Sequence, residues 1–563
     1  MAAQYDFIVV GSGPGGSVVA SRLAKSKQRP TVLLLEAGGD YNEPENRLLA
    51  DRYATWVTHP QMGWGYKTTP QEALDNRQID YSRGKGLGGS TLINFCCYTR
   101  GPKEDYDEWA RKVDDPFFNW SESQRRIKKF ENYAKNTASA VEKYVDFDGY
   151  SHGNNGSMDT MFASEAEKNY VGIVDAMIES GVQGLKGNLD LNSGDPLGVG
   201  FIPSTAKQSY RTTAASSFLK DTPPNLTIKT NSQVSKIVLE GKKVTGVVVN
   251  GETFSATKEV ILSAGALDTP KILMLSGIGP APHLKEHDIP VLLDIPDVGQ
   301  NLQDHYGTSV VWEMKPGWDD RPALEDPSQM ARAKEEFLRN GTGPLTTFNN
   351  SCIMAWIHDP ATVATPEAKF LPAEVQKYIS QPAVPTMEVI AAVPAFPPEG
   401  GKSYLSLTPV GMTAQSTGSV TLASRNAADA PLCDPQLLTN PYDKQNAIRG
   451  IRYALEIVKN SSLQKDMVKP YLVPADESDE AIWEFIKGNV SSTWHMSCTV
   501  RMGKGEDERA CVDTKFRLKG IERLRVIDLS VLPFVPNAHT VSWAYLVGET
   551  GAERLISEYG LDG

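Results

Sequence analysis

The chain has 563 residues, of which 40% are hydrophobic, so it is long enough to bury a large core. Its 57 lysine and arginine residues stand against 69 aspartate and glutamate residues, and the formal net charge of −12 argues against the basic face that nucleic-acid binding needs. The sequence has no run of 18 apolar residues, which a membrane-spanning helix would need, and its N-terminus lacks the basic and long apolar regions of a signal peptide. We therefore expect a cytoplasmic, intracellular protein without a membrane partner.

The first 40 residues predict a βαβ unit. Residues 7–10 form a short apolar run that is typical of a strand, and a glycine-rich turn follows it. A helix is expected over roughly 16–25 and a second strand over 31–35. This order is the usual opening of a doubly wound, nucleotide-binding sheet.

The turn after the first strand is the first glycine loop, which carries the pattern G-x-G-x-x-G. The first glycine permits a tight turn, the second lets the backbone approach a pyrophosphate, and the third lets the helix pack against the strand. Free N–H groups at the start of the helix attract phosphate. Glu36, at the end of the second strand, would accept hydrogen bonds from ribose hydroxyls; it favours FAD or NAD over NADP and does not separate the first two. The loop comprises Gly11, Ser12, Gly13, Pro14, Gly15 and Gly16.

A second glycine loop lies at the start of the stretch RGKGLGGSTLINFCCYTRGPKEDYD, residues 83–107. Its glycines would let the backbone pass very close to a bound group. A second close approach of the chain suits a long cofactor with two parts, whereas the alternative is an ordinary glycine-rich turn. The residues of the loop that we single out are Gly84, Gly86, Gly88, Gly89, Ser90, Thr91, Ile93 and Asn94.

Between the motifs, the pattern predicts further helices and strands. Asn119 and Glu122 have the spacing of a capping box at the start of a helix. Residues 225–265 alternate strand-like runs with polar turns. Residues 443–459 carry apolar side chains at helical spacing, namely Ile448, Ile451, Leu455 and Val458.

Several stretches resemble the signature motifs of the glucose–methanol–choline (GMC) flavoprotein oxidoreductases. The second glycine loop resembles the first signature, and GALDTPKILMLSGIG (265–279) matches the second at every defining position. Because the motifs occur in the right order from residue 11 to residue 549, the resemblance covers essentially the whole chain. The remaining motifs are GQNLQDH (299–305), WHMSCTVRMG (494–503) and LRVIDLSVLP (524–533).

The resemblance implies an α/β fold of the GMC type. It predicts a Rossmann-like FAD-binding domain and a substrate-binding domain with a mostly antiparallel sheet and flanking helices. We expect the FAD-binding domain to comprise residues 1–155, 205–310 and 505–563, and the substrate-binding domain to comprise 156–204 and 311–504. The oligomeric state does not follow from the sequence.

The family pattern also implies which residues contact FAD. The ADP part would lie against the first glycine loop, Glu36 and Val234, the last of which is similar in position to a residue whose backbone contacts the adenine. Some relatives bind the flavin covalently through a histidine in the second glycine loop; Ile93 occupies that position here, so we expect FAD to be held non-covalently. The remaining expected contacts are Gly88, Ser90, Asn94, Asp528 and His539.

His495, in WHMSCTVRMG, and His539, in FVPNAHTVSWAYLVGE, are the predicted catalytic pair. Alone, a histidine in an apolar stretch is more often a core residue, but the resemblance implies that both imidazoles lie over the reactive face of the flavin. Oxidation of an alcohol releases a hydride, which flavin N5 accepts, and a hydroxyl proton, which a neutral imidazole can accept. We expect His495 to be the base and His539 to hold the substrate oxygen. The family's usual proline and glycine after the first histidine are replaced by Met496 and Cys498.

The segments INFCCYTRGPKEDYDEW and GPLTT resemble the fungal alcohol-oxidase-like branch of the family. We therefore predict oxidation of a primary alcohol, aromatic or otherwise apolar, to the aldehyde, with O₂ as acceptor and H₂O₂ as product. Formate is not expected, because formate oxidases carry an arginine where His539 stands. Two alternatives stay open: a dehydrogenase that uses a quinone or another acceptor, and a non-redox, hydroxynitrile-lyase-like enzyme that keeps FAD as a structural group.

Several further residues have open roles. Arg83 could pair with a charge on substrate or flavin, or form a structural salt bridge. The six cysteines include no C-x-x-C pair, which predicts buried free thiols and no metal site. Side chains that could face the substrate, with core packing as the alternative, are Phe348, Trp356, Met387 and Phe396.

Overall fold

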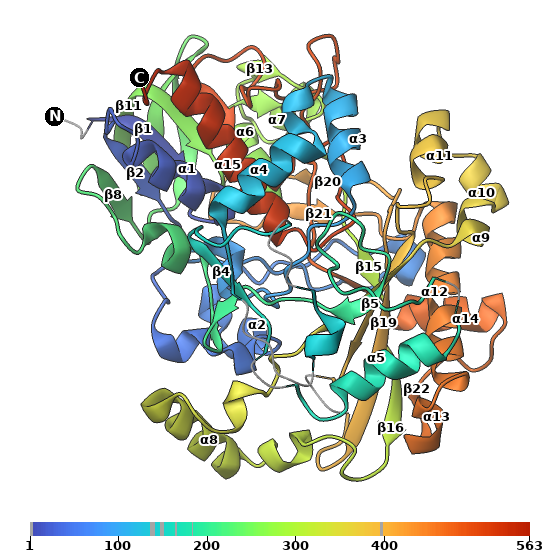
Figure 1. Ribbon diagram of the computed structural model, residues 1–563. Helices are drawn as coiled ribbons and strands as arrows, with labels where there is room; N and C mark the ends of the chain where they lie inside the picture. The colour runs from blue at the N-terminus through green and yellow to red at the C-terminus, as the bar shows by residue number, and fades with distance from the viewer. Residues whose placement is uncertain (1–3, 135–140, 147–150, 164–165, 183, 395–397) are drawn as a thin grey trace.

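The computed structural model describes residues 4–134, 141–146, 151–163, 166–182, 184–394 and 398–563. Within these residues, a mostly parallel sheet and a mostly antiparallel sheet form separate hydrophobic cores, and helices cover both (Figure 1). This arrangement confirms the predicted α/β fold class. Phe396, one of the side chains expected near the substrate, lies outside the described residues.

The first sheet is formed by β1 (Gln4–Val10), β2 (Val32–Leu35), β8 (Leu226–Lys229), β9 (Val234–Glu240), β10 (Lys243–Val249), β11 (Glu252–Leu262) and β24 (Leu524–Val526). The strand order is β8-β2-β1-β11-β10-β9, and β24 pairs with the end of β11. Strands β8, β2, β1, β11 and β24 are parallel, whereas β9 and β10 extend the sheet as an antiparallel hairpin. The predicted strands at 7–10, 31–35 and within 225–265 are therefore present.

Helix α1 (Pro14–Ala24) begins two residues earlier than predicted. A proline fits the first turn of a helix, because its missing N–H needs no partner there and its backbone angle is already helical. Helix α15 (Val541–Glu558) packs alongside α1 (Figure 1). The two helices approach closely at Gly548, where a Cβ would lie 2.8 Å from the carbonyl oxygen of Gly15.

The second sheet is formed by β15 (Tyr306–Gly307), β16 (Val310–Met314), β17 (Ile353–Ile357), β18 (Met387–Ala392), β19 (Ser403–Gly411), β22 (Met467–Leu472) and β23 (Ser491–Ser492). Its strands pair antiparallel in the order β17-β18-β19-β15-β23, with β16 between β19 and β22. Helix α12 (Pro441–Lys459) packs on β19 and buries Ile448 and Ile451, as its apolar spacing predicts.

The predicted cap starts α4 (Trp120–Phe130): the side-chain oxygen of Asn119 accepts a hydrogen bond of 3.0 Å from the backbone N–H of Glu122. The second half of a capping box is replaced, because the N–H of Asn119 donates to the carbonyl of Pro116 and the side chain of Glu122 accepts from Arg125. The other helices are α2 (Thr55–Thr58), α3 (Lys103–Val113), α5 (Tyr170–Glu179), α6 (Gly265–Leu275), α7 (Ala281–Glu286), α8 (Pro327–Asn340), α9 (Pro360–Val363), α10 (Pro366–Lys369), α11 (Ala373–Ile379), α13 (Leu463–Asp466) and α14 (Asp479–Asn489). The other strands are β3 (Glu131–Ala134), β4 (Met158–Met161), β5 (Gly198–Phe201), β6 (Ala206–Lys207), β7 (Tyr210–Arg211), β12 (Ile278–Gly279), β13 (Leu293–Asp294), β14 (Gln300–Leu302), β20 (Gly418–Thr421) and β21 (Leu432–Asp434).

The two hydrophobic cores draw on different parts of the chain, but they do not define the residues at which the domains begin and end. The first core draws its side chains from the parallel sheet with α1, α6 and α15, and the second from the antiparallel sheet with α5 and α12. The division into FAD-binding and substrate-binding domains at the expected boundaries stays a prediction. Within the described part of the chain, no helix has both the length and the apolar composition to cross a bilayer.

Candidate active site

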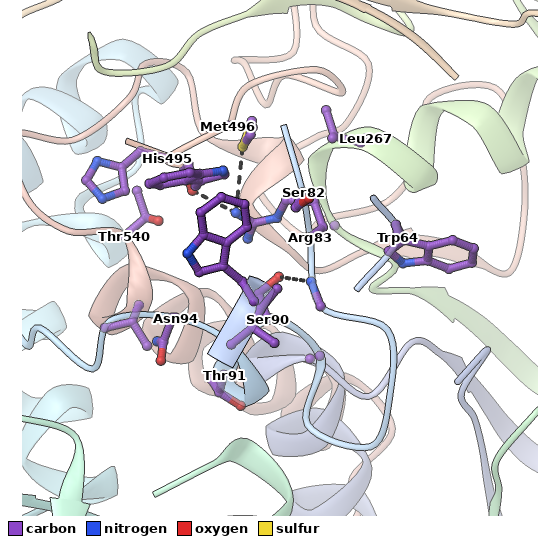
Figure 2. A pocket seen from close by; sticks show the side chains of 18 of the residues that line it. Trp64, Ser82, Arg83, Ser90, Thr91, Asn94, Leu267, His495, Met496 and Thr540 are labelled. Atoms are coloured by element: carbon purple, nitrogen blue, oxygen red, sulfur yellow. Dashed lines mark hydrogen bonds between the residues drawn. The ribbon is translucent and has the colours of Figure 1, made fainter. Parts of the chain in front are cut away.

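A cavity of about 690 Å³ lies between the two sheets. It begins at the C-terminal ends of β1 and β2, where ligands bind in doubly wound sheets, and reaches the face of the antiparallel sheet. Both glycine loops and both predicted catalytic histidines line it. Figure 2 shows His495 and Met496 on one side of this pocket and Thr91 and Asn94 on the other.

The first glycine loop has the geometry that its spacing predicts. Gly11 has a φ of +95°, and a Cβ there would lie 2.4 Å from the carbonyl oxygen of Ser263. A Cβ on Gly16 would lie 1.9 Å from the carbonyl oxygen of Gly11, so only glycine lets α1 pack this close to the turn. A Cβ on Gly13 would meet nothing within 4 Å, because this glycine faces open space. The loop therefore leaves room for a group beside the N-terminus of α1.

Glu36 lies in the cavity wall directly after β2. One carboxylate oxygen accepts hydrogen bonds from the backbone N–H (3.0 Å) and hydroxyl (2.7 Å) of Ser12, and the other accepts one from the N–H of Gly38 (3.0 Å). Burial raises the pKa of Glu36, and these hydrogen bonds oppose that shift. The carboxylate is thus held in place next to the first glycine loop, at the edge where a ribose would lie. Val234, the first residue of β9, lines the same end of the cavity.

Asp528 lies in the wall of the cavity and connects several turns through hydrogen bonds. Its carboxylate accepts hydrogen bonds from the N–H of Gly265 (2.9 Å), the hydroxyl of Thr269 (2.6 Å) and the N–H of Ser530 (2.8 Å). Burial raises its pKa. The residue lines the cavity and also fixes the start of α6, so its position fits both a structural and a ligand-binding role.

The second glycine loop meets the first directly. A Cβ on Gly89 would lie 2.6 Å from the Cα of Gly13, so the two loops touch through glycine backbone. The hydroxyl of Ser90 accepts a hydrogen bond of 3.1 Å from the N–H of Gly84 (Figure 2). Asn94 accepts a hydrogen bond of 2.7 Å from the guanidinium of Arg211. Ile93 and Thr91 also line the cavity, whereas Gly88 and Gly86 lie behind its surface: a Cβ on Gly88 would lie 3.4 Å from the Cβ of Thr213, and one on Gly86 would lie 2.8 Å from Leu92.

His495 and His539 lie side by side in the wall of the cavity, in edge contact, with ring centroids 4.8 Å apart. His539 lies just before α15, and its Nε2 is 2.8 Å from a carboxylate oxygen of Glu388 on β18. The Nδ1 atom of His495 is 3.0 Å from Nδ1 of His305 and 3.1 Å from the hydroxyl of Thr493. The side chains thus form a row from His305 through His495 and His539 to Glu388.

The two imidazoles have opposite electrostatic environments. Burial lowers the pKa of His495 well below its usual value, and the nearby charges of His539, His305 and Arg83 lower it further. Burial would also lower the pKa of His539, but the charge of Glu388 and its hydrogen bond outweigh it, so the pKa is raised. At neutral pH, His495 is therefore neutral and can accept a proton, whereas His539 keeps its proton to a higher pH than an ordinary imidazole does.

Two members of this row were not singled out from the sequence. His305 lies within GQNLQDH, where it is fully buried and burial lowers its pKa to about 3. Glu388 is a fully buried carboxylate in the apolar strand MEVIAA. Burying a charged side chain costs free energy unless the charge is paired. A glutamate within an apolar strand therefore indicates a buried partner, and this signal could have identified Glu388 from the sequence.

The substrate side of the cavity has two unlike walls. One wall is a chain of aromatic rings in which Tyr53 contacts Phe95 (centroids 5.3 Å apart) and Phe95 contacts Trp494 (5.5 Å). The other wall is the antiparallel sheet, which presents small or aliphatic side chains, namely Gly307, Ser309, Val311, Ile390, Ala392, Ser406 and Thr408. The space between them suits a flat, largely apolar molecule.

The remaining predicted residues have other positions. Trp356 and Met387 are buried within the antiparallel sheet, and Phe348 packs near α8, so these side chains belong to cores rather than to the cavity. Arg83 lines the cavity, and one of its nitrogens donates to the carbonyl of Trp494 (2.7 Å). In the described residues, Arg83 forms no salt bridge; burial lowers its pKa. The cysteines of the described chain are free and buried, and no cluster of metal ligands occurs there.

Comparison with known proteins identifies the family. Residues 5–307 and 414–548 match the two GMC oxidoreductase family models, N-terminal and C-terminal. The chain is 32% identical, over 99% of its length and 93% of the relative, to a glucose methanol choline oxidoreductase of Aspergillus terreus. It resembles the solved structure of an FAD-dependent oxidoreductase from Chaetomium thermophilum, with 27% identity and a TM-score of 0.87 over 99% of this chain and 100% of the other. It also resembles the solved structure of a fungal aryl-alcohol oxidase, with 25% identity and a TM-score of 0.86 over 100% of both chains. FAD is accordingly the cofactor of this enzyme, which acts on the CH–OH group of a donor. The chain belongs to the GMC oxidoreductase family.

Proposed function

We propose that the enzyme oxidises a primary alcohol with an aromatic or apolar body to the aldehyde and passes the electrons to O₂. The observation that carries this proposal is the pair His495–His539, in which one imidazole is neutral and the other keeps its proton to a higher pH than usual, at the end of a cavity that begins at two glycine loops. This asymmetry suits the removal of a hydroxyl proton beside a group that holds the same oxygen.

The residues around the cavity fit FAD. We propose that the ADP part lies along the first glycine loop, with Glu36 at the ribose and Val234 at the adenine, and that the second glycine loop and Asp528 hold the remainder. Open space in front of Gly13 and the glycine contact between the loops leave room for a pyrophosphate. When bound, FAD supplies an acceptor for the substrate hydride at N5.

Each of the chain's own groups then has a defined task. His495 accepts the hydroxyl proton of the substrate, because its low pKa keeps it neutral at neutral pH. His539 donates a hydrogen bond to the substrate oxygen, and Glu388 holds its ring and its proton in place. The aromatic wall around Phe95 and Trp494 excludes water from the reacting carbon.

The shape of the cavity supports an aromatic or apolar donor. Aromatic rings and small side chains both line it, and the similar fungal aryl-alcohol oxidase acts on aryl alcohols by name. We expect no turnover of formate, because His539 offers no fixed guanidinium for a carboxylate. Cations beside the flavin site, chiefly His539, would favour O₂ over a bulky acceptor.

The test is an anaerobic panel of primary alcohols, aromatic and aliphatic, mixed with the holoenzyme while the absorbance of oxidised flavin is recorded. A bleached spectrum that recovers rapidly on admission of O₂, with release of H₂O₂, supports the oxidase. Bleaching that recovers only with a quinone or dye would identify a dehydrogenase instead. No bleaching by any alcohol would favour the lyase-like alternative, in which FAD is structural.

A further inference from the structure

Two cysteine thiols meet at the active-site cavity, outside the proposed proton-transfer machinery; Cys97 lines the cavity and Cys352 is buried next to it. The Sγ atom of Cys97 lies 3.6 Å from the Sγ atom of Cys352. Cys97 follows the second glycine loop and lines the cavity, whereas Cys352 directly precedes β17 of the antiparallel sheet. Because the two residues are 255 positions apart in the chain, their contact joins the loop side of the cavity to the sheet side.

Two basic side chains, Arg52 and His539, act on Cys352, and their effect outweighs that of the nearby Glu388. Arg52 is completely buried and donates a hydrogen bond of 2.9 Å to the carbonyl of Ser351, the residue before Cys352. Its Nε atom has no hydrogen-bond partner in the part of the chain that the structure describes. The hydrogen bond from Cys97, with the charges of Arg52 and His539, lowers the pKa of the Cys352 thiol despite burial. A thiolate in such surroundings is a better nucleophile than an ordinary buried thiol.

The alternative is a purely structural role, in which the two cysteines are small core side chains whose thiols contact each other. Two features argue against it. Burial alone would raise the pKa of both thiols, yet the pKa of Cys352 is lowered, because Cys97 donates to it and the guanidinium of Arg52, held by Ser204, Tyr53 and Ser351, favours its thiolate. An inert pair is also sealed from small molecules, yet Cys97 lies in the surface of the cavity.

We propose that Cys97 and Cys352 form a peroxide-sensitive dithiol, which hydrogen peroxide converts into an intramolecular disulfide in the wall of the active-site cavity. The thiolate of Cys352 attacks an oxygen of the peroxide, and the O–O bond breaks to give a sulfenic acid on Cys352 and hydroxide. The second thiol then attacks the sulfenic sulfur, the S–S bond forms, and water leaves. Overall, two thiols and one H₂O₂ give one disulfide and two molecules of water.

The disulfide requires the two sulfur atoms to move from 3.6 Å to a bond length of about 2 Å, which side-chain rotation can supply. The new bond would link the segment behind the second glycine loop to β17. Because it closes a very long loop of the chain, it restricts the unfolded state and raises the unfolding midpoint. A thiol reductant reverses both effects.

The experiment treats the holoenzyme with added H₂O₂, so its result does not depend on whether the enzyme makes peroxide. After alkylation under denaturing, non-reducing conditions, mass spectrometry of the digest should show a peptide that joins Cys97 to Cys352 and lacks two hydrogens. The count of free thiols should fall from six to four. The thermal unfolding midpoint should rise by several degrees and return after dithiothreitol.

Matched variants separate this pair from its neighbours. Cys97→Ser and Cys352→Ser should each abolish the cross-link and the rise in midpoint. Cys433→Ser removes a buried thiol elsewhere, whose Sγ contacts the carbonyl of Pro431, and should behave as the wild type. Cys96→Ser should also still form the link, which excludes the adjacent thiol. Six intact thiols after peroxide, a link through Cys96, or sulfinic acids without a link would each overturn the proposal, and the wild-type digest decides this even if a variant fails to fold.

Discussion

His495 is the residue on which the proposed reaction depends most directly, since its imidazole lies in the cavity and burial keeps it neutral. We expect His495→Ala to slow flavin reduction by roughly 100- to 10,000-fold, the usual worth of a positioned base. FAD should remain bound, because the glycine loops are untouched. Stopped-flow measurement of flavin bleaching tests this, with His287→Ala, at the end of α7, as the control that should react normally. Persistent turnover in His495→Ala would show that another group takes the proton.

Glu388 sets the charge of His539. Its carboxylate raises the pKa of that imidazole, so the ring stays protonated to a higher pH than it otherwise would. Glu388→Gln keeps a hydrogen-bonding side chain but removes the charge, so the pKa of His539 falls and the protonated form is lost at a lower pH. The alkaline limb of the rate of flavin reduction should therefore move to lower pH.

The readout for Glu388 is the pH profile of bleaching, which a purely structural role would not shift. Glu335→Gln, on the exposed face of α8, changes the same charge far from the cavity and should leave the profile unmoved. An unchanged profile in Glu388→Gln would mean that the protonation of His539 does not limit the reaction.

At the scale of elements, the turn between β1 and α1 depends on the absence of a side chain at Gly16. Gly16→Ala would place a Cβ 1.9 Å from the carbonyl oxygen of Gly11, so the helix must move. We expect a loss of about 1 to 3 kcal/mol in the free energy of unfolding and weak retention of FAD. Denaturant unfolding and the flavin content after gel filtration measure the two effects.

Gly172 supplies the matched control for Gly16. It lies within α5, and a Cβ there would meet nothing within 4 Å. Gly172→Ala should therefore leave FAD binding unchanged and stabilise the fold by about 0.5 to 1 kcal/mol, because alanine loses less backbone freedom in a helix. Equal behaviour of the two variants would contradict the close packing of α1 against its turn.

At the scale of the whole molecule, FAD would bridge the two glycine loops without a covalent bond. Ile93 offers no nucleophile to the flavin, so acid denaturation should release all flavin into the supernatant. Adding FAD to the apoprotein should raise the free energy of unfolding by about 2.7 kcal/mol at a hundredfold excess over Kd. ADP, which reaches only the first glycine loop, should raise the free energy of unfolding less than the same concentration of FAD does. Flavin that stays with the precipitate would show a covalent link through another residue.

The features that follow from the sequence are those that depend on residues close together in the chain. The strand, turn and helix around Gly11 to Gly16 follow from short-range rules on glycine, proline and apolar spacing, and the structure confirms them with a helix start shifted by two residues. The cap at Asn119 and the apolar face of α12 were predicted for the same reason. The domain boundaries and the roles of the site residues stay predictions.

By itself, the sequence determined the α/β class, the two glycine loops, the GMC family and therefore FAD, because each rests on a local pattern or on several patterns in a fixed order. Only the tertiary structure decided which side chains meet. Glu388 reaches His539 across 151 residues, His305 reaches His495 across 190, and Cys97 reaches Cys352 across 255. No local rule predicts such contacts, because they arise where distant parts of the chain pack together; the contact of His305 with His495, for example, follows the pairing of β15 with β23. The same packing buries the charged groups, and their mutual effects shift each pKa.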